Sequence, residues 1–130
     1  MDIISKYNIN IVEESIYLWE DTNLKNKINI EDLNEICIDS TTIKLSFSIN
    51  YKYTEIYTFT NSEGFKIKDV LKIIFNYYNG LLSENEKTLF KKYKLETRKD
   101  LLIKNNQIYF DGLLFANNTL HNDIYYVQIA

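Results

Sequence analysis

The hydrophobic period of this 130-residue chain changes at residues 61–64, and that change restricts the fold more than any other feature. Before it, apolar and polar residues alternate, as in IKLSFS at residues 43–48. After it, apolar residues recur at every third or fourth position over residues 66–79. Alternation distributes side chains over the two faces of a strand, whereas spacings of three and four gather them on one face of a helix. The chain therefore predicts a fold that combines strands and helices.

The alternating half predicts strands at residues 36–38, 43–49 and 53–60, which we expect to form an antiparallel meander. One face of these strands is apolar and the other carries Ser, Thr and Lys. This pattern is typical of a sheet with helices on one side and water on the other. Asp39, Ser40 and Thr41 have side chains that suit the first turn, because they can bond to the local backbone.

The second half predicts a helix over residues 66–79 that ends at Asn79-Gly80, since glycine tolerates the left-handed conformation after a last turn. Ser83 is followed three residues later by Glu86, the spacing of a capping box. A second helix is therefore predicted over residues 83–94. Its buried side is predicted to consist of Leu89, Phe90 and Tyr93.

The two ends of the chain add further elements. Residues 11–20 predict a helix with Trp19 as a core anchor, and residues 98–102 a short helical turn. Residues 107–115 and 124–129 predict two strands joined by a polar loop. Together these patterns predict an α+β fold, a mostly antiparallel sheet of about five strands with two or three helices packed on one face.

Composition predicts a single domain over residues 1–130, because the chain has no proline and only three glycines with which to build a linker. The amino-terminal residues are acidic and contain no long apolar run, so neither a signal peptide nor a membrane span is predicted. We expect a cytoplasmic or nuclear protein. The bias toward Ile, Asn, Lys and Tyr is expected of an AT-rich coding sequence, as in large DNA viruses, and does not bear on function.

Catalytic and metal chemistry is disfavoured by the residues themselves. One cysteine and one histidine fall short of the ligands that a zinc site needs, and the isolated glycines form no phosphate-binding loop. His121 lies in a polar loop where a solvated side chain is expected, and Cys37 lies in an apolar alternation that predicts a buried, inert thiol. We therefore expect no enzyme, no cofactor and no metal.

Charge suggests one alternative function. Residues 66–104 carry ten basic and five acidic side chains, whereas residues 1–65 carry five and eleven. A helix, a glycine-containing turn, a lysine-bearing helix and a later hairpin follow the order of a winged helix-turn-helix. The single arginine and the acidic pI of 5.2 stand against nucleic-acid binding. The candidate contacts of this alternative are Lys87, Lys91, Lys92 and Lys94.

Tyrosine favours a different function, a non-catalytic protein-interaction or structural module that binds a protein partner or associates with itself. The chain has 11 tyrosines, more than one small core can hold, and amphipathic rings are favoured at protein interfaces. The terminal strand IYYVQIA has no edge-protecting charge or proline, so it either pairs centrally or accepts a partner strand. The candidate interface residues are Tyr51, Tyr53, Tyr109, Tyr125 and Tyr126.

Overall fold

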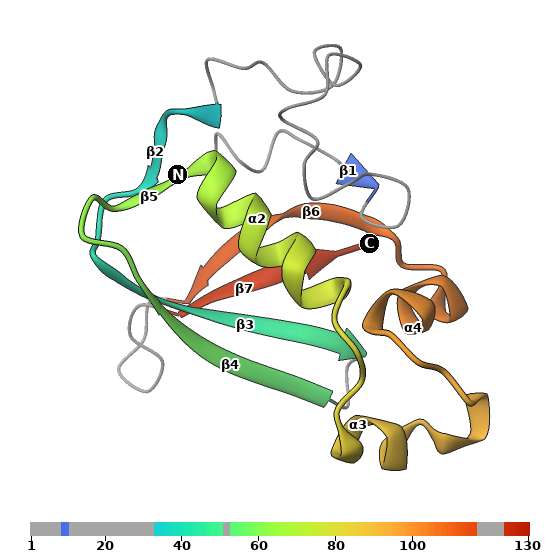
Figure 1. The fold of residues 1–130 in the computed structure, drawn as a ribbon. Coiled ribbons are helices and arrows are strands. Elements are labelled where there is room, and N and C mark those ends of the chain that lie inside the picture. Colours follow the sequence, from blue (N-terminus) through green and yellow to red (C-terminus); the bar gives the residue numbers. More distant parts are fainter. Residues whose placement is uncertain (1–8, 11–32, 51–52, 117–123) are drawn as a thin grey trace.

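A computed structural model describes residues 9–10, 33–50, 53–116 and 124–130 and confirms the α+β fold. Five strands form the main sheet in the order β1-β6-β7-β3-β4 (Figure 1). All neighbours are antiparallel except β3 and β7, which run parallel. The strand bounds are β1 Ile9–Asn10, β3 Thr42–Asn50, β4 Tyr53–Thr60, β6 Tyr109–Ala116 and β7 Ile124–Ile129.

The predicted three-stranded meander is wrong in its first strand. β3 and β4 do form an antiparallel hairpin, but β2 (Ile36–Ile38) pairs instead with β5 (Phe65–Lys66) in a separate two-stranded sheet. Ile38 and Phe65 are partners in this small sheet and both are buried. Burial of these two apolar side chains at the entrance to the following helix therefore accounts for the separation of β2 from the main sheet.

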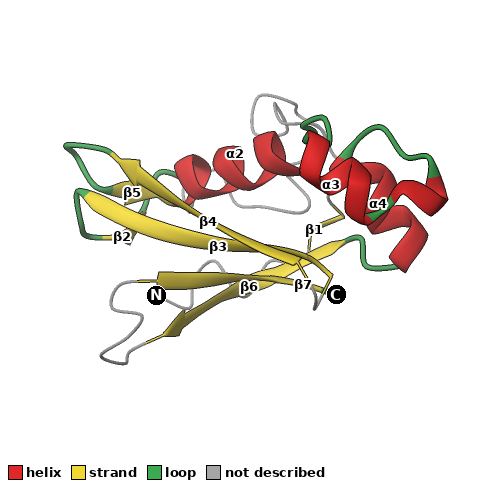
Figure 2. Cartoon of the chain, turned by 90° about the horizontal axis from the view of Figure 1, so that it is seen from below, coloured by secondary structure: helices red, strands yellow, loops and turns green. Residues whose placement is uncertain are grey.

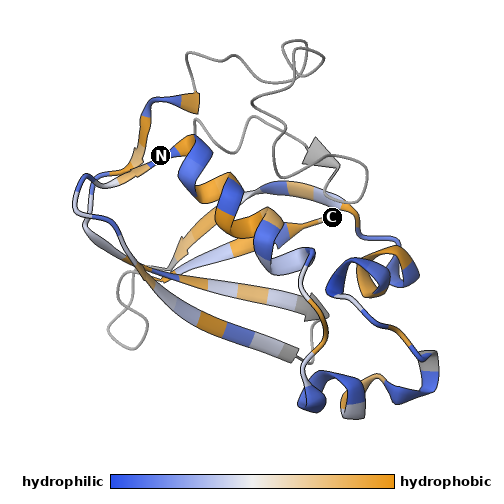
Figure 3. Ribbon diagram, in the orientation of Figure 1, coloured by the Kyte–Doolittle hydropathy of each residue, from blue (hydrophilic) through white to orange (hydrophobic). Residues whose placement is uncertain are grey.

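The predicted helix over residues 66–79 is confirmed as α2 (Ile67–Tyr78), which lies across one face of the main sheet (Figure 1). Its apolar stripe is fully buried, and Figure 3 shows the alternation of apolar and polar residues along it. The facing side chains of β3 are also buried, with 0 to 1% exposure at Ile43, Leu45 and Phe47. At the first turn, the Lys66 backbone N–H donates to Asp69 Oδ2 at 2.9 Å. We call this side of the sheet the covered face.

The predicted helix over residues 83–94 is wrong in its length. The capping box of Ser83 and Glu86 is present, but α3 spans only Glu84–Leu89 and is followed by the 3-10 turn η3 (Lys91–Tyr93). Of its predicted buried side, Phe90 is buried, Leu89 is 59% exposed, and the Tyr93 side chain lies outside the described residues. The chain leaves the helix at Phe90, which turns its ring into the core, so Leu89 remains outside.

The last helix and the final hairpin agree with the sequence. The helical turn predicted over residues 98–102 is the first part of α4 (Arg98–Asn105), which continues for three more residues, and β6 and β7 pair as antiparallel strands. β7 lies between β6 and β3, so the terminal strand pairs centrally and offers no edge to a partner. Within the described residues, no helix has the length and apolar character needed to cross a membrane. The helix predicted over residues 11–20, the loop of residues 117–123 with His121, and Tyr51 lie outside the described residues.

Candidate interaction surface

The face of the main sheet opposite α2 carries no helix from the described part of the chain (Figure 2). Four side chains form a row across this open face, one from each of four neighbouring strands. The pairing register aligns Ile56 of β4 with Ser46 of β3, Ser46 with Tyr126 of β7, and Tyr126 with Leu114 of β6. Paired residues point to the same face of a sheet, so these side chains are neighbours. We call them the open-face row.

The open-face row is largely apolar and accessible at its two ends. Ile56 is 49% exposed and Leu114 is 59% exposed, while Tyr126 is half-buried. Ser46 lies between Ile56 and Tyr126 and is only 2% exposed, and its hydroxyl has no hydrogen-bond partner among the described residues. Exposed apolar side chains around a buried hydroxyl are not needed for the core, so they are available for contact with another molecule.

A shallow hollow of about 360 Å³ lies along this row. Among the described residues, hydroxyl, amide and apolar groups line it, and no carboxylate, ammonium or imidazole does. Such a neutral lining suits the side chains of another polypeptide rather than a charged ligand. The lining residues are Ser46, Ser48, Thr54, Leu114, Tyr126, Val127 and Gln128.

The outer edge of β4 borders the same face. Among the described strands, β4 has β3 as its only neighbour, and it is the outermost strand of the sheet (Figure 1). The backbone N–H of Asn61 donates to the Thr41 carbonyl oxygen at 2.8 Å, which fixes the phase of the β3–β4 ladder. Antiparallel ladders alternate between bonded and non-bonded pairs, so Thr54, Ile56 and Thr58 point their N–H and C=O groups outward.

The register shift between β3 and β4 lies at the start of this edge, between Ser48 and Asn50, and the described residues after it carry none of the usual protection against pairing. Residues 54–60, TEIYTFT, contain no proline, glycine or lysine and a single charge, Glu55. β-branched and aromatic residues of this kind favour extended pairing. Native edges are normally protected by lysine, proline or a bulge, and an unprotected one is a template for another strand.

The structure separates the predicted interface tyrosines. Tyr126 lies in the open-face row, whereas Tyr125 faces the covered side, where its ring lies 4.9 Å from that of Phe115. Tyr109 follows the alternation away from buried Phe110 and is 42% exposed. Tyr53 begins β4, but its side chain lies outside the described residues. The sequence missed Ile56 and Leu114, although the position of Ile56 among threonines of the polar alternation was a signal for it.

The only arginine of the chain is used inside the fold. Arg98 Nε and Nη2 donate to the two carboxylate oxygens of Glu86 at 3.0 and 2.9 Å, and Nη1 donates to the Tyr77 carbonyl oxygen at 3.0 Å. Its guanidinium also lies 4.1 Å from the Tyr77 ring, which stacks on Phe47 at 4.1 Å. Glu86 is fully buried. Arg98 therefore ties α4 to α3 and α2, with its guanidinium largely buried.

Gly80 is explained by this arginine rather than by the predicted left-handed turn. Its φ is not positive, and the residue before it, Asn79, has a right-handed conformation. A Cβ at Gly80 would lie 2.7 Å from Arg98 Nη1 and 3.1 Å from the Tyr77 carbonyl oxygen. The glycine thus provides the space through which the guanidinium reaches Tyr77.

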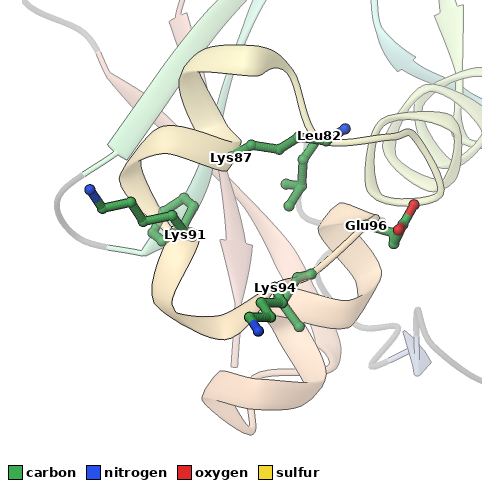
Figure 4. A pocket seen from close by; sticks show the side chains of 7 residues that line it. Leu82, Lys87, Lys91, Lys94 and Glu96 are labelled. Carbon is green, nitrogen blue, oxygen red and sulfur yellow. The ribbon is translucent and has the colours of Figure 1, made fainter.

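Three of the four predicted lysine contacts line one hollow of about 310 Å³ beside α3 (Figure 4). Lys87, Lys91 and Lys94 form no ion pair with any described residue, and Lys94 adopts a left-handed conformation with φ 52°. Figure 4 shows Lys91 and Glu96 pointing away from each other at the rim. Lys92 is exposed but does not line the hollow. The remaining lining residues are Leu82, Phe90, Leu95 and Glu96.

Cys37 is buried, as predicted, and burial raises the pKa of its thiol to about 11. Within the described ranges, no three His, Cys, Asp or Glu side chains are grouped to hold a metal ion. No family model matches the chain, and no curated protein and no solved structure matches it either.

Proposed function

We propose that the protein is a non-catalytic interaction module that binds a polypeptide by adding an extended strand beside β4. The observation that supports this most directly is the unprotected edge, with the outward backbone groups of Thr54, Ile56 and Thr58 bordering the open-face row. In strand addition, backbone hydrogen bonds supply affinity and alternate side chains supply specificity. Here the alternate side chains of the added strand would contact Ile56 and extend the row.

The residues at this surface support the proposal of a non-catalytic role. General acid–base chemistry needs a titratable group within reach of a reacting atom, with a partner that orients it. Among the described residues, the open-face hollow presents the hydroxyls of Ser46 and Thr54, the phenol of Tyr126 and the amide of Gln128, and no described carboxylate or imidazole lines it to orient that phenol. These groups form hydrogen bonds and van der Waals contacts, which fits recognition.

A photo-cross-linking residue at position 56 tests this function in cells that express the chain. p-Benzoyl-phenylalanine in place of Ile56 should form an adduct that mass spectrometry assigns to an extended segment of a protein. Leu89 is the matched control position, because it is 59% exposed but lies on α3. Equal adduct formation at positions 56 and 89 would contradict the proposal.

Nucleic-acid binding is a second candidate function, supported by the grouping of Lys87, Lys91 and Lys94 around one hollow. The short α3 and the inclusion of the β6–β7 hairpin in the main sheet differ from a winged helix-turn-helix. Fluorescence anisotropy with labelled duplex and single-stranded probes at two salt concentrations tests it. Phosphate contacts require affinity that falls steeply with salt, and Lys87→Glu with Lys91→Glu should then abolish binding.

A further inference from the structure

The proposed strand addition leaves the identity of the added strand open, and we infer that it is β4 of a second copy of this chain. This inference rests on the proposed function, because it uses the same edge. An edge strand that pairs with its own copy about a two-fold axis forms an isologous contact, in which each copy presents the same surface. The main sheet would then run through both copies.

The phase of the ladder restricts which residues can face each other. Only residues with outward backbone groups exchange hydrogen bonds with the new strand, so even-numbered positions of β4 must oppose even-numbered positions of its copy. A two-fold axis at Ile56 satisfies this condition. It pairs Ile56 with the second Ile56, and Thr54 with Thr58 in both directions.

The side chains favour this register on both faces of the sheet. On the open face, the two Ile56 side chains cover each other, and Thr54 meets Thr58, a favourable cross-strand pair. The open-face row then continues from one copy to the other through Ile56. Burial of the exposed part of Ile56 contributes to association because it removes apolar surface from water.

The covered face provides hydrogen-bonding complementarity. Glu55 is the only charged residue of the edge, and within one copy the Tyr57 hydroxyl donates to its carboxylate. With the axis at Ile56, Glu55 of one copy opposes Tyr57 of the other. The two carboxylates are therefore not placed opposite each other. Each faces a tyrosine hydroxyl, the same kind of donor from which it accepts a hydrogen bond within its own copy.

Shifting the axis by one residue, to Tyr57, keeps the ladder in phase but changes the partners. Glu55 would then oppose Phe59, and Ile56 would oppose Thr58. This register places a carboxylate against an apolar ring and leaves the two Ile56 side chains apart. The chemistry of the pairs therefore favours the axis at Ile56.

Disulfide cross-linking of the full chain tests this register. The Cα atoms of a hydrogen-bonded antiparallel pair lie about 5.5 Å apart, within the range of a disulfide. Ile56→Cys should therefore form a covalent dimer under mild oxidation, as should a mixture of Thr54→Cys with Thr58→Cys. Thr58→Cys alone should not form one, because an offset of four residues along the strands separates position 58 of one copy from position 58 of the other by roughly 13 Å. The unmodified chain is a control for Cys37, which is buried.

Charge substitution at the same position supplies an independent readout by sedimentation equilibrium. Ile56→Lys and Ile56→Glu each place like charges opposite one another, so each alone should associate at least about tenfold more weakly than the unmodified chain. Mixing the two variants should restore association as a heterodimer. Efficient cross-linking of Ile56→Cys with Thr58→Cys, or unchanged association of Ile56→Lys, would overturn the register.

The inference and the function beneath it fail in different ways. If the unmodified chain sediments as a monomer at every concentration up to the millimolar range, pairing with a second copy is wrong. An adduct between position 56 and a different protein would then leave strand addition intact. If the chain neither associates with itself nor forms an adduct at position 56, both the pairing of two copies and the proposed strand addition are wrong.

Discussion

The two faces of the main sheet use one strand in opposite ways. On the covered face, β3 presents Leu45 and Phe47, which are fully buried under α2 and the aromatic rings around it. On the open face it presents Ser46, bordered by Ile56, which is about half exposed. The covered face stabilises the fold, whereas the exposed apolar side chains of the open face, Ile56 and Leu114, contribute little to it. Substitutions on the covered face should therefore destabilise the fold far more than substitutions on the open face.

Phe47→Ala should have the largest effect because it removes the centre of an aromatic cluster. The Phe47 ring is stacked on Tyr77 and meets Tyr78 and Tyr57 edge-on. Loss of a buried phenylalanine costs about 3–5 kcal/mol of the free energy of unfolding. Urea titration followed by circular dichroism measures this loss. The control is Phe115→Ala, which is 41% exposed and should cost clearly less.

Arg98→Met should cost about 3 kcal/mol, because it leaves the buried carboxylate of Glu86 without its ionic partner. Adding Glu86→Gln to this variant should recover part of the loss, since the uncompensated charge is removed while the Ser83 N–H keeps an acceptor. A double-mutant cycle of urea unfolding measures the coupling. Additive effects of the two substitutions would show that the ion pair does not hold α3 in place.

Alkaline pH should lower the free energy of unfolding, because buried groups of the core ionise more easily in the unfolded chain. Burial raises the pKa of Cys37 from 9.0 to about 11, and it also raises the pKa of Tyr77 and Tyr78 above the usual value. The folded state therefore keeps protons that the unfolded state releases, and stability present below pH 9 is lost as pH rises through 11. For Cys37 the full loss is about 2–3 kcal/mol.

Comparison of the unmodified chain with Cys37→Ala isolates the cysteine contribution. Urea unfolding at pH 8 and at pH 10.5 should show a smaller decrease for the variant. The part of the tyrosinate absorbance at 295 nm that comes from Tyr77 and Tyr78 should rise together with unfolding, because these buried rings ionise only when released. An equal decrease in both proteins would contradict a thiol held protonated by burial.

Ile56→Ser and Leu114→Ser should have the smallest effect on folding. Both side chains are about half exposed or more, and substitutions of this kind usually change stability by less than about 0.5 kcal/mol. The measurement is urea unfolding at a dilute concentration, where association does not contribute. A loss above about 1.5 kcal/mol would show that the open-face row belongs to the core.

Long periodic segments could be predicted from the sequence, and short or long-range features could not. α2 and β3 carry enough apolar repeats to fix both type and buried face, whereas the three residues of β2 have no period that assigns them to a sheet. The capping box of Ser83 and Glu86 was visible. The burial of Glu86 was not, since it depends on an arginine twelve residues later.

The candidate surface depends on strand order, which is why the sequence located it only in part. Alternation assigns Tyr126 to the polar face of its strand, but the parallel pairing of β7 with β3 decides which side chains are its neighbours. The same pairing places β7 at the centre and leaves β4 at the edge. Such a contact between distant segments leaves no local pattern.

Amide hydrogen exchange at two protein concentrations tests most directly whether β4 is the interaction edge. The N–H groups of Tyr57 and Phe59 point toward β3 and should be protected at both concentrations, whereas those of Thr54, Ile56 and Thr58 should become protected only at the high concentration. Association without slower exchange at Ile56 and Thr58 would contradict strand pairing at this edge.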